Sequence, residues 1–337
     1  MSRSYPRNCW YVAATSDEVT GTPLGRRAVD QAVVLFRVSD GRAVALEDRC
    51  AHRPYPLSLG RVDGDTIVSG YTGFAYDASG ACVRVPTQDR IPVGARVRAF
   101  PVHDDGTFVW AWLGDPARAS LRTAPSVPWL ADPAWASFGS QWETHAAIDL
   151  LQENFADISH ITVVDPDFAP PVLRSAPPRL DVEVSETSVS FSRDYPPAEL
   201  TAWHSELVGR PAGTLFRQRE LGQFVTPGLW VDGWEAGEDG GGPACTFRFT
   251  HALTPIDATH TRHLWRVSRD FALQPDAEQT LRPMFEQYYR RVQAILETMQ
   301  AVLDRDGPRP TVSVSADAAA LQVRKIVRQM VADETPR

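Results

Sequence analysis

The first 114 residues consist of short apolar runs separated by turn signals, and no other feature limits the possible folds as strongly. The runs are Ala32–Phe36, Ala43–Leu46, Thr66–Val68, Val97–Phe100 and Thr107–Leu113. Asp-Gly pairs lie between them at 40–41, 63–64 and 105–106, and this dipeptide favours tight hairpin turns. We therefore expect a small all-β domain, followed by a Pro- and Ala-rich linker over Asp115–Ala134.

The second half of the chain changes character. Asp149–Val164 lacks Gly and Pro and carries apolar residues at helical spacing, which predicts a helix. Segments typical of strands then follow at Leu180–Phe191, Cys245–Leu253 and His260–Phe271, and long helices are expected at Asp276–Leu303 and Ala316–Val331. An antiparallel sheet around long helices is an α+β arrangement. We predict two domains, residues 1–118 and 119–337.

Composition narrows the possible partners of the chain. Its 337 residues carry a net charge of −8, which argues against a nucleic-acid surface, since phosphate binding needs clustered Lys and Arg. No apolar run has the length of a membrane span or of a signal peptide, so we expect a cytoplasmic protein without a membrane partner. The four cysteines show no CxxC spacing and predict neither a zinc site nor a disulfide framework.

Several motifs, in order along almost the whole chain, resemble a known family. Cys50-Ala51-His52-Arg53 and Gly70-Tyr71-Thr72-Gly73-Phe74 are similar to the cluster-binding segment of a Rieske domain. Glu153–His160 is similar to the iron-site helix of the catalytic domain in the Rieske non-haem iron oxygenase α subunits, aromatic O-demethylase branch. The resemblance implies a Rieske-like β domain and a helix-grip catalytic domain, in which an antiparallel sheet surrounds long helices.

The resemblance also implies where cluster ligands would fall. The family pattern is Cys-x-His followed, about sixteen residues later, by Cys-x-x-His, with two ligands to each iron. The first pair is present as Cys50 and His52, but the second falls on Ser69 and Thr72. Because a neutral hydroxyl is a poor replacement for thiolate or imidazole on iron, we interpret the four positions as vestigial and expect no [2Fe-2S] cluster.

The mononuclear iron site shows a similar departure. The family takes two His from His-x-x-x-x-His on one helix; His160 is the first, and the second position holds Asp165. The carboxylate position falls on Tyr289, or on Tyr288 with a shifted register, and Glu286 lies close by. We expect no Fe(II); if a metal is retained, its ligands would be His160, Asp165 and Glu286.

Three functions remain open on these grounds. The favoured one is a redox-inactive enzyme that uses the former iron pocket for cofactor-independent chemistry. The reaction would be a cyclisation, a [4+2] pericyclic reaction, an isomerisation or a dehydration. The substrate would be an apolar small molecule such as a natural-product intermediate. The alternatives are a non-catalytic partner subunit of an intact oxygenase and an oxygenase with an altered metal site. A homotrimer is expected, as in the family. The candidate catalytic residues are Asn154, Asp157, His160, Asp165, Tyr288 and Tyr289; the competing interpretation is a purely structural polar network.

Overall fold

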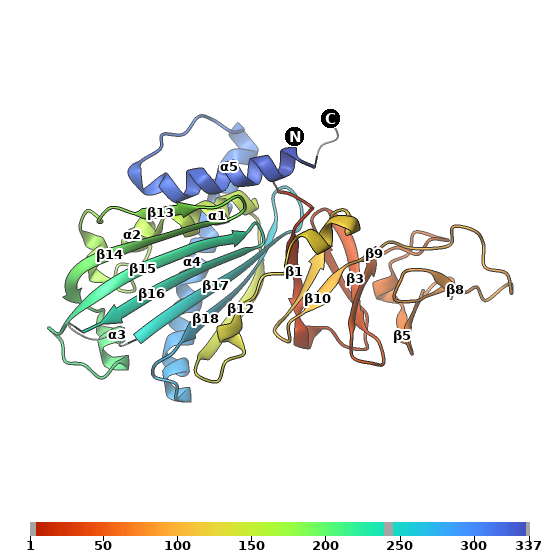
Figure 1. Ribbon diagram of the computed structural model, residues 1–337, viewed down its shortest axis with the longest axis horizontal. Helices are drawn as coiled ribbons and strands as arrows, with labels where there is room; N and C mark the ends of the chain where they lie inside the picture. The colour runs from red at the N-terminus through yellow and green to blue at the C-terminus, as the bar shows by residue number, and fades with distance from the viewer. Residues whose placement is uncertain (1–4, 239–244, 335–337) are drawn as a thin grey trace. The chain divides into compact units, whose positions relative to one another are not determined.

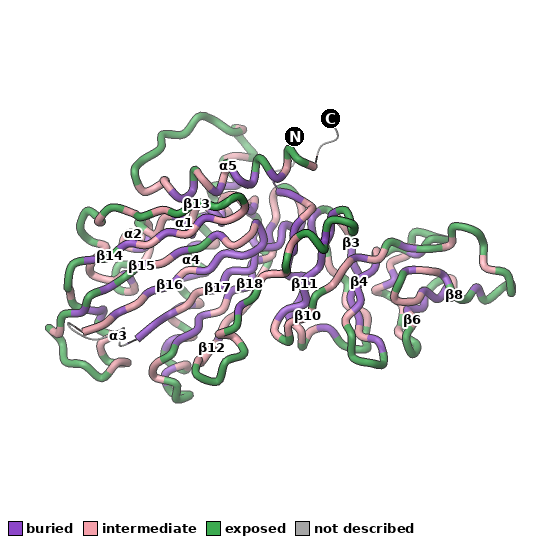
Figure 2. The backbone as a smooth tube through the Cα atoms, in the orientation of Figure 1, coloured by how far each residue is buried: buried purple, intermediate pink, exposed green. Residues whose placement is uncertain are grey.

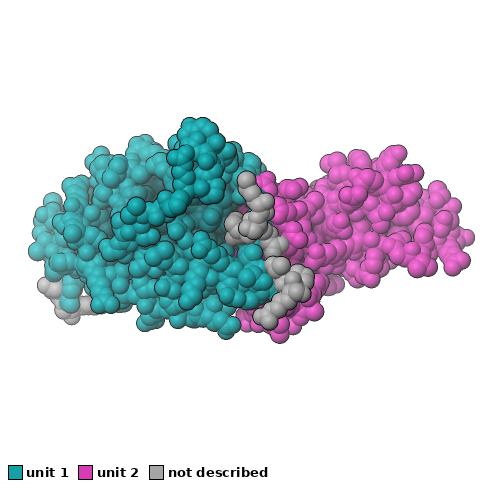
Figure 3. All heavy atoms as spheres, turned by 90° about the horizontal axis from the view of Figure 1, so that it is seen from above, with its two compact units in different colours: residues 1–5, 127–253, 258–337 teal, residues 6–126, 254–257 magenta. Residues whose placement is uncertain are grey.

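The computed structural model describes residues 5–238 and 245–334, which form two compact units (Figure 3). Unit 2 comprises Pro6–Ser126 and Thr254–Asp257, and unit 1 comprises Met1–Tyr5, Val127–Leu253 and Ala258–Arg337. The sequence predicted a division between residues 118 and 119, whereas the units divide after residue 126. The segment 254–257 belongs to unit 2 although it is far from that unit in sequence, because Thr254 Oγ1 donates a hydrogen bond to the carbonyl of Val12 (2.7 Å).

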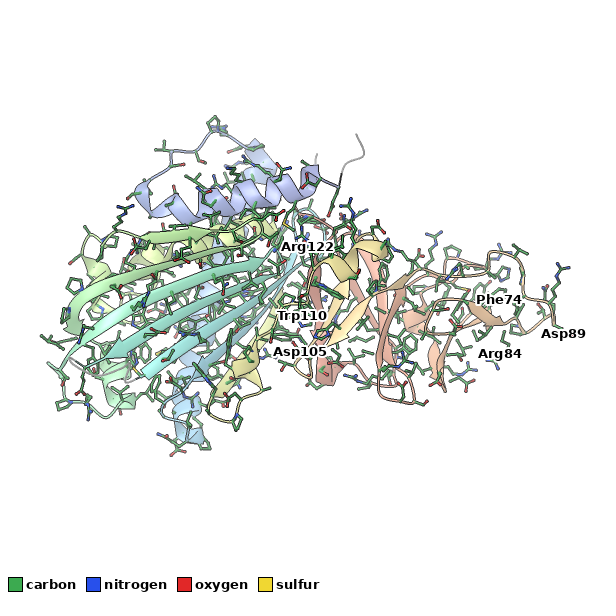
Figure 4. All side chains as sticks on the ribbon, in the orientation of Figure 1. Phe74, Arg84, Asp89, Asp105, Trp110 and Arg122 are labelled. Carbon is green, nitrogen blue, oxygen red and sulfur yellow. The ribbon has the colours of Figure 1, made fainter. Side chains whose placement is uncertain are left out.

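Unit 2 is built from short antiparallel strands, as its Asp-Gly turns predict. Its sheets are β1 (Trp10–Thr15), β11 (Phe108–Trp112) and β10 (Val102–Asp104); β2 (Leu24–Ala28), β3 (Gln31–Arg37), β4 (Ala43–Glu47) and β9 (Ala99–Phe100); and β5 (Arg61–Asp63), β6 (Thr66–Val68), β7 (Ala75–Tyr76) and β8 (Cys82–Arg84). One turn shows the cause: Asp105 accepts hydrogen bonds from the backbone N–H of Phe108 (2.7 Å) and from Trp110 Nε1 (3.0 Å; Figure 4). The carboxylate thereby holds the β10–β11 hairpin closed.

Unit 1 contains one seven-stranded antiparallel sheet in the order β12-β18-β17-β16-β15-β14-β13 (Figure 1). The strands are β12 (Ala136–Thr144), β13 (Asp181–Val184), β14 (Val189–Glu199), β15 (Leu215–Thr226), β16 (Leu229–Gly237), β17 (Cys245–Pro255) and β18 (Thr261–Arg269). The α-helices are α1 (Ile148–Ala156), α2 (Ile161–Val164), α3 (Ala202–Leu207), α4 (Pro275–Asp306) and α5 (Ala318–Ala332). Together the units confirm the predicted α+β class.

Short 3₁₀ helices connect these elements. They are η1 (Ser16–Glu18), η2 (Leu57–Leu59), η3 (Pro116–Leu121), η4 (Pro128–Leu130), η5 (Ile158–His160), η6 (Pro171–Arg174) and η7 (Ser315–Asp317). Two of them, η3 and η4, lie in the segment that the sequence predicted as a linker, and each has Pro in its first turn, where no N–H is needed.

The long helix α4 buries one face, as its apolar spacing predicts. The buried positions Leu281, Phe285, Tyr288, Val292 and Leu296 recur every three or four residues, and α4 packs against β12. In Figure 2 the strands β16 to β18 are largely drawn as buried, which places the unit 1 core between the sheet and this helix. No helix among the described residues is long and apolar enough to cross a membrane. The cytoplasmic location stays a prediction.

Candidate active site

A cavity lies within unit 1, between the sheet and its helices. It contains about 880 Å³ of unfilled space, part of it open to solvent. Side chains from α1, η5, α3 and α4 line it together with β15, β16 and β17. Most of them are apolar or aromatic, so a bound molecule would lose most of its contact with water. Polar side chains are few, and their pairing defines what the cavity can do.

His160 and Tyr288 form the first polar pair of the cavity. The Nδ1 of His160 lies 2.9 Å from the carbonyl oxygen of Asp157, and its Nε2 lies 3.0 Å from the hydroxyl of Tyr288. A carbonyl only accepts, so Nδ1 carries the proton, and Nε2 accepts the hydrogen bond that the Tyr288 hydroxyl donates. Burial lowers the pKa of His160 below its ordinary value of 6.5, and this imidazole is therefore neutral at pH 7.

The position of His160 follows from a break in the predicted helix over 149–164. Helix α1 ends at Ala156, and Asp157 adopts extended backbone angles (φ −141°, ψ 108°). The Asp157 carboxylate then caps η5 by accepting from the backbone N–H of Ser159 (2.9 Å) and from its hydroxyl (3.0 Å). The cap turns the chain so that the carbonyl of Asp157 faces the ring of His160 and fixes its tautomer.

A carboxyl group lies on the sheet side of the cavity, on β15. Glu220 is 3% exposed, and its Oε2 accepts hydrogen bonds from Tyr195 (2.7 Å) and from Arg193 Nη1 (3.1 Å). Burial raises the pKa of Glu220 above its ordinary value of 4.5, and the charge of Arg193 opposes that rise. Burial likewise raises the pKa of Tyr195, with the charge of Glu220 adding to the effect. These three residues form a closed hydrogen-bonded group behind the cavity surface.

A second carboxyl group, Asp232, lies on the neighbouring strand β16. Burial raises its pKa well above 3.8, and the nearby Glu220 adds to this, while the hydrogen bond that Trp230 Nε1 donates to Oδ1 (2.5 Å) opposes it. The Oδ2 atom lies 3.7 Å from His251 Nε2. Burial lowers the pKa of His251 well below 6.5, so this imidazole is neutral and the contact is not an ion pair.

His251 also pairs with a second buried histidine. Its Nδ1 lies 3.0 Å from Nε2 of His263, and burial lowers the pKa of His263 to about 3. The ring of Tyr289 packs edge-on against both histidines, with centroids 5.5 and 6.1 Å away. Burial raises the pKa of Tyr289 well above 10, and the charges of Tyr288 and Asp232 contribute to that rise. The helix and sheet sides of the cavity therefore interact electrostatically.

The structure separates the residues that the sequence grouped as one site. Asn154, His160, Tyr288 and Tyr289 line the cavity. Asp157 and Asp165 are not among its lining residues: Asp157 supports His160 through its carbonyl, and Asp165 Oδ2 pairs with Arg291 on α4 (2.8 Å). Glu286 is also absent from the lining; its side chain is 43% exposed and lies 3.9 Å from Arg282.

Sequence reasoning missed the polar residues on the strands, Gln218, Glu220, Asp232, His251 and His263. A signal did exist, because side chains alternate between the two faces of a strand. Glu220 is in phase with the buried Phe216 and Phe224 on β15, and His251 with Phe247 and Phe249 on β17. A polar residue in the apolar phase of a strand marks a buried polar site.

In unit 2 the positions with cluster-ligand spacing are brought together. Cys50 Sγ lies 3.5 Å from Thr72 Oγ1 and 3.3 Å from the hydroxyl of Tyr76, and Thr72 Oγ1 lies 3.5 Å from Ser69 Oγ. Burial raises the pKa of Cys50, but the hydrogen bonds from Tyr76 and Thr72 outweigh this and give a net lowering. His52 is exposed and stacks on Phe74 (centroids 4.8 Å apart; Phe74 is labelled in Figure 4).

Two glycines allow the two loops of this region to approach each other closely. A Cβ added at Gly70 would lie 2.5 Å from the carbonyl oxygen of Leu59, and Gly73 has φ +70° with Pro86 Cγ 2.8 Å from such a Cβ. Only glycine fits both positions without strain. The backbone that brings Cys50, Ser69 and Thr72 together is therefore specified by the sequence.

Comparison with known proteins identifies the class of protein that this fold and these sites define. Residues 9–101 match the Rieske [2Fe-2S] domain family, and residues 144–333 match the vanillate O-demethylase oxygenase C-terminal domain. The chain is 30% identical to the toluene-4-sulfonate monooxygenase system iron-sulfur subunit of Comamonas testosteroni, over 97% of each chain. It is 26% identical to a vanillate O-demethylase oxygenase subunit of a Pseudomonas species, over 98% of this chain and 96% of that one.

Solved structures agree with the sequence matches. A crystal structure of dicamba monooxygenase bound to 3,6-dichlorosalicylic acid superposes with a TM-score of 0.90 at 26% identity, covering 100% of both chains. This confirms the resemblance drawn from the Cys50 and Glu153 motifs. The chain belongs to the Rieske oxygenase α-subunit family, with the vanillate O-demethylase type of C-terminal domain.

Family membership corrects the expectation on cofactors. The prediction that the chain has no [2Fe-2S] cluster and no Fe(II) is contradicted, because its N-terminal match is a [2Fe-2S] domain and its relatives include iron-sulfur subunits. The prediction rested on the side chains at single ligand positions, and the match over the whole [2Fe-2S] domain contradicts it.

The side chains at the expected ligand positions still differ from the donors that usually hold a Rieske cluster or a mononuclear iron. The cluster loops present one thiol and one imidazole, from Cys50 and His52, beside the hydroxyls of Ser69 and Thr72. In the cavity, His160 Nε2 accepts from Tyr288, and Asp165 is paired with Arg291. Neither donor set matches a two-Cys, two-His cluster or a two-His, one-carboxylate iron site, so no step below is routed through a metal.

Proposed function

We propose that the cavity of unit 1 binds a small, largely apolar molecule and rearranges it by proton transfer, without net oxidation. Cyclisation, isomerisation and dehydration belong to this class, because each needs a base at one point of the substrate and an acid at another. The observation that carries the proposal is the neutral His160 on the helix side of the cavity, together with raised carboxyl pKa values at Glu220 and Asp232 on the sheet side.

His160 takes the role of the base. Its Nε2 is unprotonated and its Nδ1–H is held by the carbonyl of Asp157, so the imidazolium that forms on proton uptake keeps a hydrogen-bond acceptor. The hydroxyl of Tyr288 holds the ring in place until a substrate group displaces it or passes a proton through it. Because burial raises the pKa of Tyr288, this hydroxyl remains protonated at pH 7.

Asp232 takes the role of the acid. Its raised pKa favours the protonated carboxyl group, and Trp230 already occupies Oδ1, so Oδ2 is the atom that donates to the substrate.

A model reaction tests this base without knowledge of the natural substrate. A base that removes the ring C–H proton of 5-nitrobenzisoxazole breaks its N–O bond and releases a coloured 2-cyano-4-nitrophenolate. We expect saturable turnover by the wild type and a loss of about a hundredfold or more in His160→Ala, at the low end for general-base catalysis. His103, which is exposed on β10, provides the matched control His103→Ala. Equal rates in His160→Ala and wild type would refute the proposal.

A second candidate, a monooxygenase acting on an aromatic compound, is favoured by the names of the relatives. Iron and acid-labile sulfide measured on anaerobically prepared protein separate the two candidates. The matched variant Ser69→Cys/Thr72→His restores the two-Cys, two-His set. Equal cluster content in wild type and variant supports the oxygenase. Cluster in the variant alone supports proton transfer. The homotrimer expected from the family also stays a prediction, and sedimentation equilibrium of the purified chain tests it.

A further inference from the structure

One part of the cavity wall holds polar atoms that nothing in the described part of the protein satisfies. They are Gln218 Oε1 on β15, Trp234 Nε1 on β16 and Trp203 Nε1 on α3, all shielded from solvent and without a hydrogen-bond partner. Gln218 is 2% exposed and Trp234 is 7% exposed. Buried polar atoms without partners are rare in folded proteins and cost free energy, so three of them on residues that line one cavity favour a ligand that supplies the missing partners. We call these three residues the recognition set.

The orientation of Gln218 is determined by its surroundings. Its Nε2 donates to the carbonyl oxygens of Ala198 (3.2 Å) and Glu199 (3.3 Å), beside the irregularity in the β14–β15 pairing. Both partners only accept, so the amide nitrogen must be on that side and the amide oxygen on the other. Gln218 lines the cavity, and its amide oxygen is the acceptor that lacks a partner within the described part of the protein.

The indole of Trp203 is also fixed in place. Its ring stacks on Phe168 (centroids 5.9 Å apart, planes 14° apart) and on His204 (5.2 Å, 14°). Phe168 in turn stacks on Tyr288 (4.6 Å, 17°), the hydrogen-bond partner of His160. A column of nearly parallel rings thus connects Tyr288, the partner of the proposed base, to Trp203 of the recognition set.

The ligand group that fits follows from the donor and acceptor types. An indole N–H only donates and the Gln218 oxygen only accepts, so the complement is an acceptor oxygen next to an N–H or O–H donor. We propose that the recognition set binds a neutral carbonyl group with an adjacent donor, as in a carboxamide, an enolised dicarbonyl or an un-ionised carboxylic acid. The inference rests on the proposed function, since it concerns the far end of a substrate whose near end meets His160.

Three ligands of similar size test this recognition directly. 2-Naphthamide offers a carbonyl and an adjacent N–H, 2-acetonaphthone offers the carbonyl alone, and 2-ethylnaphthalene offers neither. We expect affinity for the full-length protein, measured by calorimetry, to fall in that order, by about three- to tenfold for each group lost.

Variants assign each preference to an atom. Gln218→Met keeps the side-chain volume and should abolish the preference for the amide over the ketone. Trp234→Phe should weaken both carbonyl ligands about threefold or more while leaving 2-ethylnaphthalene unchanged. Trp142→Phe is the matched control, because the Trp142 indole N–H is likewise buried without a partner but does not line the cavity.

The outcomes separate this inference from the proposed function. If all three ligands bind equally well while His160→Ala still abolishes proton abstraction, the recognition set is wrong and the base assignment stands. If none of them binds while the wild type still turns over 5-nitrobenzisoxazole, the recognition set is wrong and the base assignment stands. If the amide preference survives in Gln218→Met, folded by circular dichroism, another acceptor makes the contact and the inference is overturned.

Discussion

The hydroxyl of Tyr288 donates a hydrogen bond to Nε2 of His160 over 3.0 Å, while the carbonyl of Asp157 holds the opposite ring nitrogen. These two contacts fix a neutral imidazole with its unprotonated nitrogen on the cavity side. The tyrosine comes from α4, and the histidine from η5, 128 residues earlier in the chain. Their meeting depends on the tertiary packing of α4 beside α2 and η5.

The first prediction concerns the pH dependence of proton abstraction. Burial lowers the pKa of His160, so the base stays unprotonated as the pH falls below 6.5. The rate of proton abstraction should fall only when the pH approaches this lowered pKa. The charge of Asp157 acts against that lowering. Asp157→Asn should therefore move the acid limb of the pH–rate profile for 5-nitrobenzisoxazole to lower pH. Asp167→Asn, at an exposed position nearby, should leave it in place; a shift to higher pH in Asp157→Asn would contradict the assignment.

The second prediction concerns the buried ion pair between Arg193 and Glu220, whose side chains are 8% and 5% exposed. Arg193→Met leaves the carboxyl of Glu220 without its counter-charge and should lower the free energy of unfolding by about 3 kcal/mol. The double variant Arg193→Met/Glu220→Met removes both charges and should regain most of that loss. Urea unfolding measures both. A double variant as unstable as the single one would show that the pair does not act as a unit.

The third prediction follows from the raised pKa of Asp232. The folded protein binds the proton of the Asp232 carboxyl group more tightly than the unfolded chain does. Its contribution to the free energy of unfolding is therefore complete below the ordinary pKa of 3.8. This contribution is lost as the pH rises through the pKa of Asp232 in the folded protein. The stability of Asp232→Asn relative to wild type should therefore increase from pH 4 to pH 8 in urea unfolding. Asp89→Asn, in the exposed loop labelled in Figure 4, should show no such trend. A decrease over the same range would mean that Asp232 is ionised in the fold.

The fourth prediction concerns acid stability and His263. Burial lowers the pKa of this histidine from 6.5 to about 3, so protons bind the unfolded chain first as the pH falls. The wild type should lose up to about 1.4 kcal/mol of stability per pH unit through this group between those values. His263→Gln should show a shallower loss from pH 6.5 to pH 5, and His103→Gln should match the wild type. Parallel curves for His263→Gln and wild type would contradict a neutral His263.

Periodicity predicted much of the fold. The Asp-Gly turns between short apolar runs predicted the strands of unit 2, and the spacing of buried residues in α4 predicted the helix that carries Tyr288 and Tyr289. The predicted helix over 149–164 was interrupted at Asp157 because an aspartate side chain can cap a new turn as readily as it can continue a helix. No local pattern distinguishes these two outcomes.

The sheet side of the cavity was harder to predict. On β15, Gln218 and Glu220 stand among Arg217, Arg219 and Gln223, so the segment resembles an exposed strand. The strand phase of Glu220 was the one local signal of its burial, and the partner that satisfies it, Arg193, comes from β14. Pairings between strands distant in sequence carry this information, and a single sequence does not display them. The expectation that the chain holds no [2Fe-2S] cluster and no Fe(II) also failed. It rested on a few substituted ligand positions, although the rest of the chain matches the family.

A double-mutant cycle on proton abstraction from 5-nitrobenzisoxazole tests the central claim, that a base at His160 and an acid at Asp232 act on one substrate. The rates of wild type, His160→Ala, Asp232→Asn and the double variant are compared under identical conditions. Groups that act as a unit are non-additive, so we predict that the double variant is about as slow as His160→Ala alone. Losses that multiply, or an Asp232→Asn rate equal to wild type, would contradict the account.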